Sequence, residues 1–226
     1  MDPRKYYEAY DDRYKQAHKA GICWFGGGSS PIVGQILEKY NIATNRRILE
    51  LGCGEGRDAQ VLLRNGYNLL ATDISAEAIR YCKESLPTHR EAFYLLDCVS
   101  GSLPDRYDFI YAVAVLHMLV LDEDRKGFYC FIRNHLTTDG LALICTMGDG
   151  EIELKSDIAE AFALQERKYH GQRIMVAGTS CRIVNSMTFE KELTENGLEI
   201  AEKGQTSIPD EFSDMMYALV KRANRE

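Results

Sequence analysis

Three glycines stand at alternate positions directly after an apolar run, in the stretch ILELGCGEGRDA at 48–59. Glycine has no Cβ, so Gly52, Gly54 and Gly56 would let a ligand come close to the backbone of a tight turn. Dinucleotide-binding turns follow the pattern GxGxxG, whereas Arg57 stands here at the place of the third glycine, and the GK[ST] of a phosphate-cradling loop is absent. The spacing therefore favours a ligand other than a pyrophosphate.

Carboxylates accompany this turn. Glu50 precedes it and Glu55 lies within it, and both would repel phosphates and attract a cation or an ammonium group. Asp73 comes 17 residues after Gly56, at the end of the next apolar run, where a carboxylate can accept hydrogen bonds from both hydroxyls of a ribose. A ligand with an adenosine, an amino-acid tail and a positive charge fits this set. We therefore predict S-adenosylmethionine as the cofactor.

The elements that would position these residues alternate along the chain. Short apolar strands separated by helices predict a parallel sheet with helices on both faces. We expect strands at 48–51, 69–72, 93–96, 109–114 and 141–146, and helices at 58–65, 75–85 and 122–135. After residue 150 we expect a helix at 157–169, a helix capped by Thr188 that ends near 196, and strands at 198–203 and 215–221, which can pair antiparallel.

The first 30 residues are rich in aromatic side chains. Tyr6, Tyr10 and Tyr14 are four apart and would line one face of a helix. Ser30 and Pro31 predict the start of a second helix, which would end near residue 40. We interpret the chain as a single domain at 1–226. Its expected parts are a helical lid at 1–40, a cofactor-binding core at 46–147, a substrate-side insertion at 148–187, and a helix and strand pair at 188–226.

Four segments resemble the motifs of one enzyme family. ILELGCGEG at 48–56, ATDIS at 71–75, LLDCVSG at 95–101 and YDFIYAVAVLHML at 107–119 resemble those of the class I S-adenosylmethionine-dependent methyltransferases in order and spacing. The resemblance implies their α/β fold, a Rossmann-like, doubly wound, seven-stranded and mostly parallel sheet with an antiparallel C-terminal strand pair. The aromatic N-terminal segment is loosely similar to the lids of small-molecule members, such as the tellurite-resistance and thiopurine methyltransferases.

The resemblance also implies roles for single residues. Asp73 would bind the ribose, Asp97 would accept a hydrogen bond from the adenine amino group, and the small side chain of Cys98 would lie beside the adenine. The cofactor-binding residues that it implies are Glu50, Gly52, Cys53, Gly54, Gly56, Asp73, Ile74, Asp97, Cys98, Ala112 and Val113.

The candidates for catalysis and acceptor binding lie elsewhere. His117 follows the fourth expected strand, and its usual pKa near 6.5 suits a general base, although it could instead hold the pocket wall. Aromatic faces attract a sulfonium as they attract an ammonium group, unless they only pack their helix on the core. The candidates for the lid and the acceptor pocket are Tyr10, Tyr14, Trp24, Phe25, Asp149 and Glu151. Asp139 and Asp149 could also suggest a metal site, but their spacing is not tight, and we predict no metal.

The composition disfavours several classes of binding partner. The formal net charge of −7 disfavours a protein that grips nucleic-acid phosphates, and no [DN]PP[YF] run of the enzymes that methylate exocyclic base nitrogens occurs. Seven cysteines, none in a CxxC pair, disfavour a disulfide framework or a zinc site and suit a reducing compartment. The N-terminus has no apolar h-region, and the longest apolar stretch, at 109–121, is too short to span a bilayer. We expect a cytoplasmic protein with a small-molecule substrate and no nucleic-acid or membrane partner.

The predicted reaction is methyl transfer from S-adenosylmethionine to a small-molecule acceptor by in-line displacement, with S-adenosylhomocysteine as the product. Two alternatives stay open at this point. One is a non-catalytic member that binds the cofactor and regulates a partner. The other is an NAD-dependent oxidoreductase on a similar sheet, which the GxGxG spacing and Glu50 disfavour.

Overall fold

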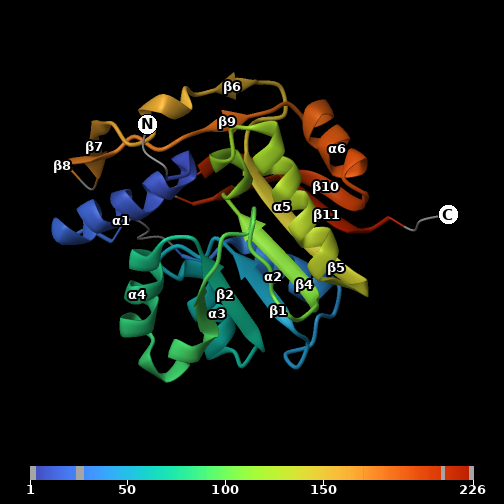
Figure 1. Ribbon diagram of the computed structural model, residues 1–226. Coiled ribbons are helices and arrows are strands. Elements are labelled where there is room, and N and C mark those ends of the chain that lie inside the picture. The colour runs from blue at the N-terminus through green and yellow to red at the C-terminus, as the bar shows by residue number, and fades with distance from the viewer. Residues whose placement is uncertain (1–3, 24–27, 170, 210–211, 224–226) are drawn as a thin grey trace.

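A seven-stranded sheet forms the centre of the protein, whose computed structural model describes residues 4–23, 28–169, 171–209 and 212–223. The strands lie in the order β10-β11-β5-β4-β1-β2-β3 (Figure 1). Their bounds are β1 Ile48–Leu51, β2 Leu69–Asp73, β3 Phe93–Leu95, β4 Tyr107–Val113, β5 Leu136–Met147, β10 Leu198–Ile208 and β11 Phe212–Arg222. Strands β1 to β5 pair in parallel, whereas β11 is antiparallel to both β5 and β10. This confirms the predicted sheet with its antiparallel C-terminal pair.

The strand order reverses at β1. This strand pairs with β2 on one side and with β4 on the other, and all four of its residues are buried. In open α/β sheets, ligands bind at the carboxyl ends of the strands where the order reverses. The fold therefore places the best ligand site beyond Leu51 and Val113, where β1 and β4 end.

Helices cover both faces of the sheet, and the side chains of β4 (Tyr107–Val113) pack against helices on both faces. Its side chains alternate between faces, as in any strand. Phe109 and Tyr111 pack in one apolar cluster with α2 (Pro31–Lys39), α3 (Arg57–Arg64) and α4 (Ala76–Ser85). Ile110 and Ala112 pack in the other with α5 (Asp122–His135) and α6 (Ser186–Glu195), and α5 lies in front of the sheet in Figure 1.

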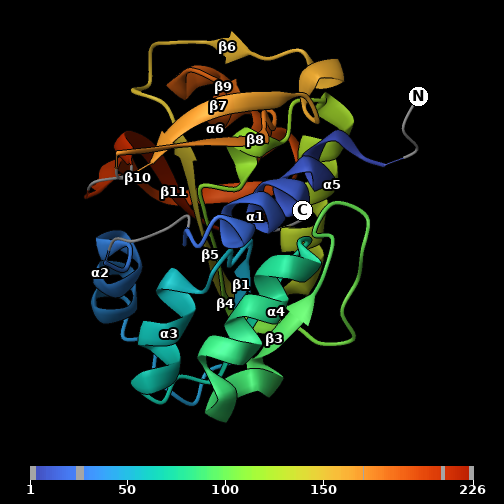
Figure 2. The same cartoon turned by 90° about the vertical axis from the view of Figure 1, so that its left-hand side faces the viewer.

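The N-terminal segment crosses the carboxyl end of the sheet. It consists of a short 3-10 turn, η1 (Tyr6–Glu8), and α1 (Ala9–Lys19). Figure 2 shows α1 lying across the upper end of β1 and β4, between the sheet and the segment that follows β5. This is the position that the predicted lid requires. Trp24 and Phe25 lie outside the described residues.

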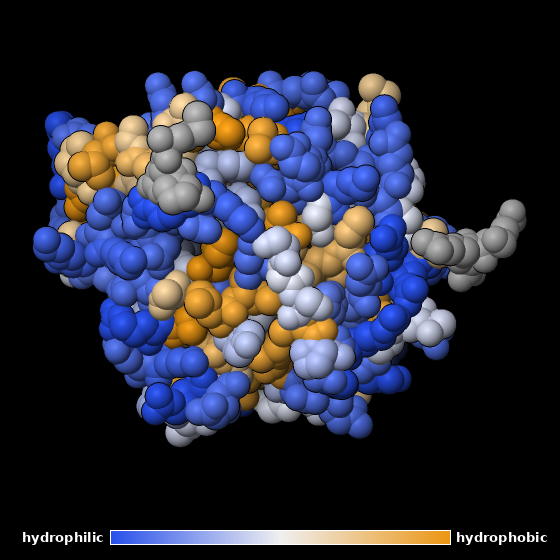
Figure 3. Space-filling view, in the orientation of Figure 1, coloured by the Kyte–Doolittle hydropathy of each residue, from blue (hydrophilic) through white to orange (hydrophobic). Residues whose placement is uncertain are grey.

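The expected helix at 157–169 is wrong. Only a 3-10 turn forms there, η4 (Ile158–Glu160), and β7 (Leu164–Tyr169) pairs antiparallel with β8 (Gln172–Ala177). Most side chains of this hairpin are exposed, among them Leu164 and Met175. Figure 3 shows apolar surface at the upper left, where the hairpin lies in Figure 1. Because neither face of the hairpin is consistently buried, its sequence carries no alternation that would indicate a strand.

Two shorter strands and a helix complete the chain. β6 (Leu154–Lys155) pairs antiparallel with β9 (Arg182–Ile183). The predicted cap at Thr188 is wrong: Asn185 is the N-cap of α6, and its side-chain oxygen accepts a hydrogen bond from the Thr188 N–H at 2.8 Å. Among the described residues, no helix is both long and apolar enough to cross a membrane.

Candidate active site

A cavity opens at the carboxyl ends of β1, β2 and β4, beneath α1. Two predicted cofactor residues, Gly56 and Ala112, do not line it. The predicted cofactor residues that do line the cavity are Glu50, Gly52, Cys53, Gly54, Asp73, Ile74, Asp97, Cys98 and Val113.

The glycine turn serves packing as well as ligand access. Gly52 has a φ of +71°, and a Cβ there would lie 2.3 Å from Cγ2 of Val115, so the loop after β4 fills the space of the missing side chain. Gly56 has a φ of +82° and caps the start of α3, away from the cavity. Left-handed backbone of this kind favours glycine. The turn therefore needs its glycines even where no ligand touches them.

Asp73 lies at the floor of the cavity with both carboxyl oxygens engaged by backbone. Oδ2 accepts a hydrogen bond from the Gly54 N–H and Oδ1 accepts one from the Ser75 N–H, each at 2.8 Å. Burial raises the pKa of Asp73 to about 6, although the two backbone donors lower it. Each oxygen can accept a further hydrogen bond. This arrangement fits the pair of hydroxyls that a ribose would offer.

Glu50 contributes a buried acceptor without a donor. Its side chain is 4% exposed, and its Oε2 atom finds no hydrogen-bond partner among the described residues. Burial raises the pKa of Glu50 well above its usual value, and the nearby Asp58 carboxylate adds to the shift. A positively charged donor from a ligand would relieve both effects. The predicted cofactor carries such a donor, the ammonium group of its amino-acid tail.

Asp97 is tied to the lid. Its Oδ2 atom accepts hydrogen bonds from Lys5 Nζ at 2.5 Å and from Ser100 Oγ at 2.7 Å, and its Oδ1 atom accepts one from the Val99 N–H. Burial alone would raise the pKa of Asp97, but the donors from Lys5 and Ser100 outweigh it, and the pKa is lowered. A ligand amino group at Asp97 would therefore share the carboxylate with Lys5, a contact that nothing in the sequence indicated.

Tyrosines of the lid form the upper wall. Tyr10 and Tyr14 line the cavity as predicted, and Tyr7 joins them. Burial raises the pKa of all three hydroxyls, so they stay neutral hydrogen-bond donors at physiological pH. Tyr7 was not predicted, because it stands outside the four-residue spacing that singled out the other two.

His117 is buried behind the cavity. Its side chain is 4% exposed, it does not line the cavity, and its ring meets the Phe212 ring edge-on with 6.1 Å between centroids. Burial lowers the pKa of His117 to about 3, and the charges of Arg125 and Arg13 act in the same direction. The imidazole is therefore neutral but a weak base. Its catalytic role stays a prediction, and this geometry does not support it.

Asp149 and Glu151 also lie away from the cavity. Asp149 Oδ1 accepts hydrogen bonds from the backbone N–H groups of Glu151 and Ile152, each at 2.9 Å, so this carboxylate closes its own turn. Neither residue lines the cavity. Within the described residues, no cluster of three or more His, Cys, Asp or Glu side chains is placed to bind a metal ion.

Several lining residues were missed by the sequence analysis. Arg57 and Asp58 enter at the start of α3, and Ala114 has a φ of +59°, a conformation that non-glycine residues seldom adopt. Their position next to the glycine turn and the end of β4 was an available signal. The remaining missed residues are Leu96, Val99, Val115, Met118 and Leu119.

Comparisons with known proteins agree with this geometry. A family model described as a methyltransferase domain matches residues 49–144. The probable S-adenosyl-L-methionine-dependent methyltransferase TehB of Haemophilus influenzae is 25% identical over 146 residues, which cover 62% of this chain and 50% of that protein. The chain spans half or less of the length of the curated relatives that it matches.

Solved structures share the fold. The glycopeptide N-methyltransferase MtfA, complexed with S-adenosyl-L-methionine, is similar with a TM-score of 0.64 at 17% identity, over 89% of this chain and 97% of that one. The 1,6-didemethyltoxoflavin-N1-methyltransferase of Burkholderia thailandensis, with 1,6-didemethyltoxoflavin and S-adenosylhomocysteine bound, has a TM-score of 0.65 at 16% identity, over 96% and 88%. The matched domain model, the strand order and the motifs at the carboxyl edge of the sheet identify residues 49–144 as a methyltransferase domain of the class I S-adenosylmethionine-dependent type.

Proposed function

We propose that this chain transfers a methyl group from S-adenosylmethionine to a small-molecule acceptor. The observation that carries the proposal is the covered cavity in which two buried carboxylates, Glu50 and Asp73, keep unused acceptor capacity. Family membership supports the donor. The cavity supports a reaction that takes place away from water.

When bound, S-adenosylmethionine supplies a methyl group on a sulfonium, and a nucleophile displaces it in line. The protein's part is to bind and orient. Asp73 would accept the ribose hydroxyls, Asp97 an adenine amino group, and Glu50 the ammonium of the amino-acid tail. Tyr10 and Tyr14 would close the cavity and exclude water, so that every charge interaction inside it is stronger.

The lid over the cavity supports a small acceptor. Tyr7, Tyr10 and Tyr14 of the N-terminal segment line the cavity, so the acceptor has to reach the donor past this segment. The two related structures described above are named as acting on a glycopeptide and on 1,6-didemethyltoxoflavin. The net charge of −7 disfavours a nucleic-acid acceptor.

The proposal does not use His117 as a base, because its ring lies outside the cavity and its pKa is low. Holding donor and acceptor in line can supply much of the acceleration. We expect His117→Gln to keep kcat within about threefold of the wild-type value, since a true general base is worth about a hundredfold or more. A loss of that larger size, at unchanged cofactor affinity, would return His117 to the mechanism.

Calorimetric titration with S-adenosylhomocysteine tests the donor site. Asp73→Ala should weaken binding by about 1–3 kcal/mol through lost ribose hydrogen bonds. Asp149→Ala is the matched control, because it removes a carboxylate outside the cavity and should leave the affinity unchanged. Binding of NADH in place of S-adenosylmethionine would refute the proposal, and tight cofactor binding without turnover across a broad panel of acceptors would favour a regulatory role instead.

A further inference from the structure

One apolar loop forms much of the cavity wall. This wall loop, residues 114–121, connects β4 to α5 and contains the 3-10 turn Leu116–Met118. It lines the cavity with Ala114, Val115, Met118 and Leu119. Its side chains are apolar except for His117, so its backbone polar groups need partners from other segments.

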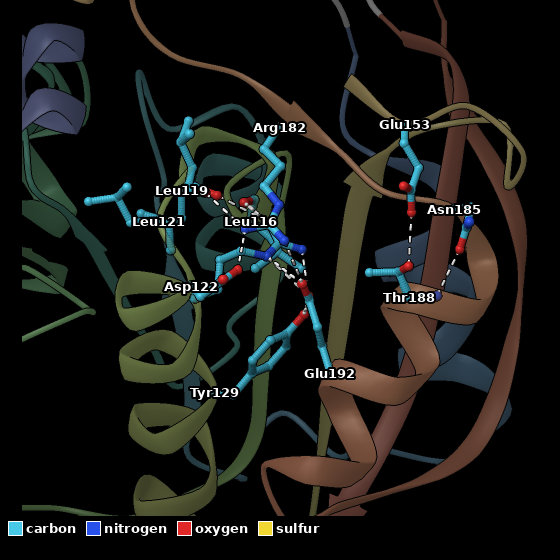
Figure 4. A network of polar contacts seen from close by, with 12 residues as sticks. Leu116, Leu119, Leu121, Asp122, Tyr129, Glu153, Arg182, Asn185, Thr188 and Glu192 are labelled. Atoms are coloured by element: carbon cyan, nitrogen blue, oxygen red, sulfur yellow. Dashed lines mark hydrogen bonds and ion pairs between the residues drawn. The ribbon is translucent and has the colours of Figure 1, made fainter. Parts of the chain in front are cut away.

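Arg125, on the first turns of α5, holds two carbonyls of the wall loop. Its Nη1 atom donates to the carbonyl oxygens of Leu116 at 2.9 Å and Leu119 at 3.2 Å. Figure 4 labels these two leucines together with Tyr129 and Glu192. The side chain is 2% exposed. Because a guanidinium is planar and rigid, two acceptors bound to one nitrogen are fixed relative to each other.

Glu192 of α6 orients this guanidinium. Arg125 Nε donates to Glu192 Oε1 at 2.9 Å and Nη2 donates to Oε2 at 2.6 Å, and the Tyr129 hydroxyl donates to the same Oε2 at 2.8 Å. Burial alone would lower the pKa of Arg125, but the Glu192 carboxylate outweighs it, and the pKa is raised. The guanidinium therefore stays charged, and its hydrogen bonds to Glu192 hold it in the orientation that reaches the loop carbonyls.

Two more segments hold the same loop. From the segment after β8, Ser180 Oγ donates to the Met118 carbonyl at 2.7 Å and Arg182 Nη1 to the Val120 carbonyl at 2.9 Å. From the lid, the Tyr6 hydroxyl accepts the Val120 N–H at 2.8 Å. The wall loop thus depends on the lid, on α5 and α6, and on the insertion together.

We propose that Arg125 is a positioning residue, which together with Ser180, Arg182 and Tyr6 fixes the wall loop for the ligands of the cavity. A buried ion pair by itself is weak evidence for a gain in stability, since apolar residues of similar size can replace such pairs without loss. What an apolar residue cannot do is bind the two loop carbonyls at once. The inference rests on the proposed function of the cavity only where ligand binding is concerned.

Hydrogen exchange in the full chain, measured by mass spectrometry, tests this assignment. Arg125→Met keeps the length of the side chain and removes every donor, and we expect exchange at 116–121 to rise about tenfold or more, because local opening becomes easier. Exchange in β1 and β2 should not change. Arg125→Lys should give a smaller rise, since an ammonium group can still donate to a carbonyl.

Arg133→Met is the matched control. Arg133 also lies on α5 and ties it to the end of α6, by donating to the Asn196 carbonyl at 2.9 Å, but it does not touch the wall loop. Equal exchange profiles for Arg125→Met and Arg133→Met, or unchanged exchange at 116–121, would overturn the proposal. Should Arg125→Met fail to fold, Ser180→Ala removes one hydroxyl only, and the same local rise is expected from it.

Affinity for S-adenosylhomocysteine completes the test. Arg125→Met should raise Kd about threefold to tenfold while Arg133→Met leaves it unchanged, since only the former loosens the cavity wall. Wild-type protein that does not bind S-adenosylhomocysteine would refute the proposed function, whereas the exchange experiment would still decide the role of Arg125. Unchanged Kd in Arg125→Met despite faster exchange would refute positioning for the ligand.

Discussion

The glycine turn and its cover are built in different ways. In the turn, the groups that face the cavity are set by near neighbours in the sheet, as where Asp73 binds the N–H groups of Gly54 and Ser75. The cover, which consists of the described part of the lid at 4–23 and the insertion at 148–187, is held by side chains that reach backbone far away in sequence. Arg13 of the lid donates to the carbonyls of Ala177 and Gly178, more than 160 residues later. Neighbouring residues therefore determine the turn, whereas contacts between residues far apart in the chain hold the cover in place.

Gly52→Ala should show the largest effect, in the turn. A Cβ would lie 2.3 Å from Val115 Cγ2, and the φ of +71° adds strain, so we expect a loss of about 2–5 kcal/mol of unfolding free energy from overpacking and left-handed backbone together. Chemical denaturation measures it. Gly66→Ala is the control, because Gly66 has a φ of +76° and no atom within 4 Å of a Cβ. Equal losses for the two variants would show that the approach of Val115 is unimportant.

Arg13→Met tests the cover in the same way. It leaves two carbonyls of the insertion without this buried donor, and we expect a loss of about 1–3 kcal/mol. Hydrogen exchange should rise in the β7–β8 hairpin and leave the glycine turn unchanged. Arg167→Met, on the exposed face of that hairpin, should have little effect. A rise that spreads through β1 and β2 would mean that cover and turn unfold as one unit.

The pH dependence of ligand binding sharpens the role of Asp73. Its raised pKa of about 6 means that protonation below this pH removes acceptor capacity. Affinity for S-adenosylhomocysteine should therefore fall about tenfold between about pH 7.5 and pH 5, that is by about 1.4 kcal/mol. Stability has the opposite sign, because a carboxyl with a raised pKa stabilises the fold below its unfolded pKa and loses that contribution as pH rises through 6. Calorimetry over this range measures the first effect, and Asp73→Asn should flatten the profile.

Lys5→Ala should have the smallest effect on stability. The Lys5 side chain is 41% exposed and its ion pair with Asp97 is open to solvent, so we expect a change of at most about 1 kcal/mol in thermal unfolding. The Lys5 side chain joins the lid to Asp97, which lines the cavity. Cofactor affinity that changes more than stability would show that Lys5 competes with or assists the ligand at Asp97.

The central sheet could be predicted because patterns among neighbouring residues determine its strands and turns. Alternate glycines, an acid at the end of each of two strands and short apolar runs predicted the sheet and carried the resemblance to the family. Of the eleven residues that the resemblance implies for cofactor binding, nine line the cavity. The two exceptions have a structural cause. Ala112 points to the opposite face of β4, toward α5 and α6, and Gly56 serves the start of α3.

The cover could not be predicted in the same way. The stretch at 157–169 has helical composition but forms a turn and a strand, because β8 supplies the hydrogen-bond partners of β7. No spacing in the sequence marks Tyr7, Lys5 or the wall loop that Arg125 binds as parts of the cavity and its cover. The sequence by itself determined the sheet and the donor edge, since neighbouring residues decide strands and turns. Only the tertiary structure decided which side chains close the cavity, because those contacts join residues that are far apart in the chain and meet only after folding.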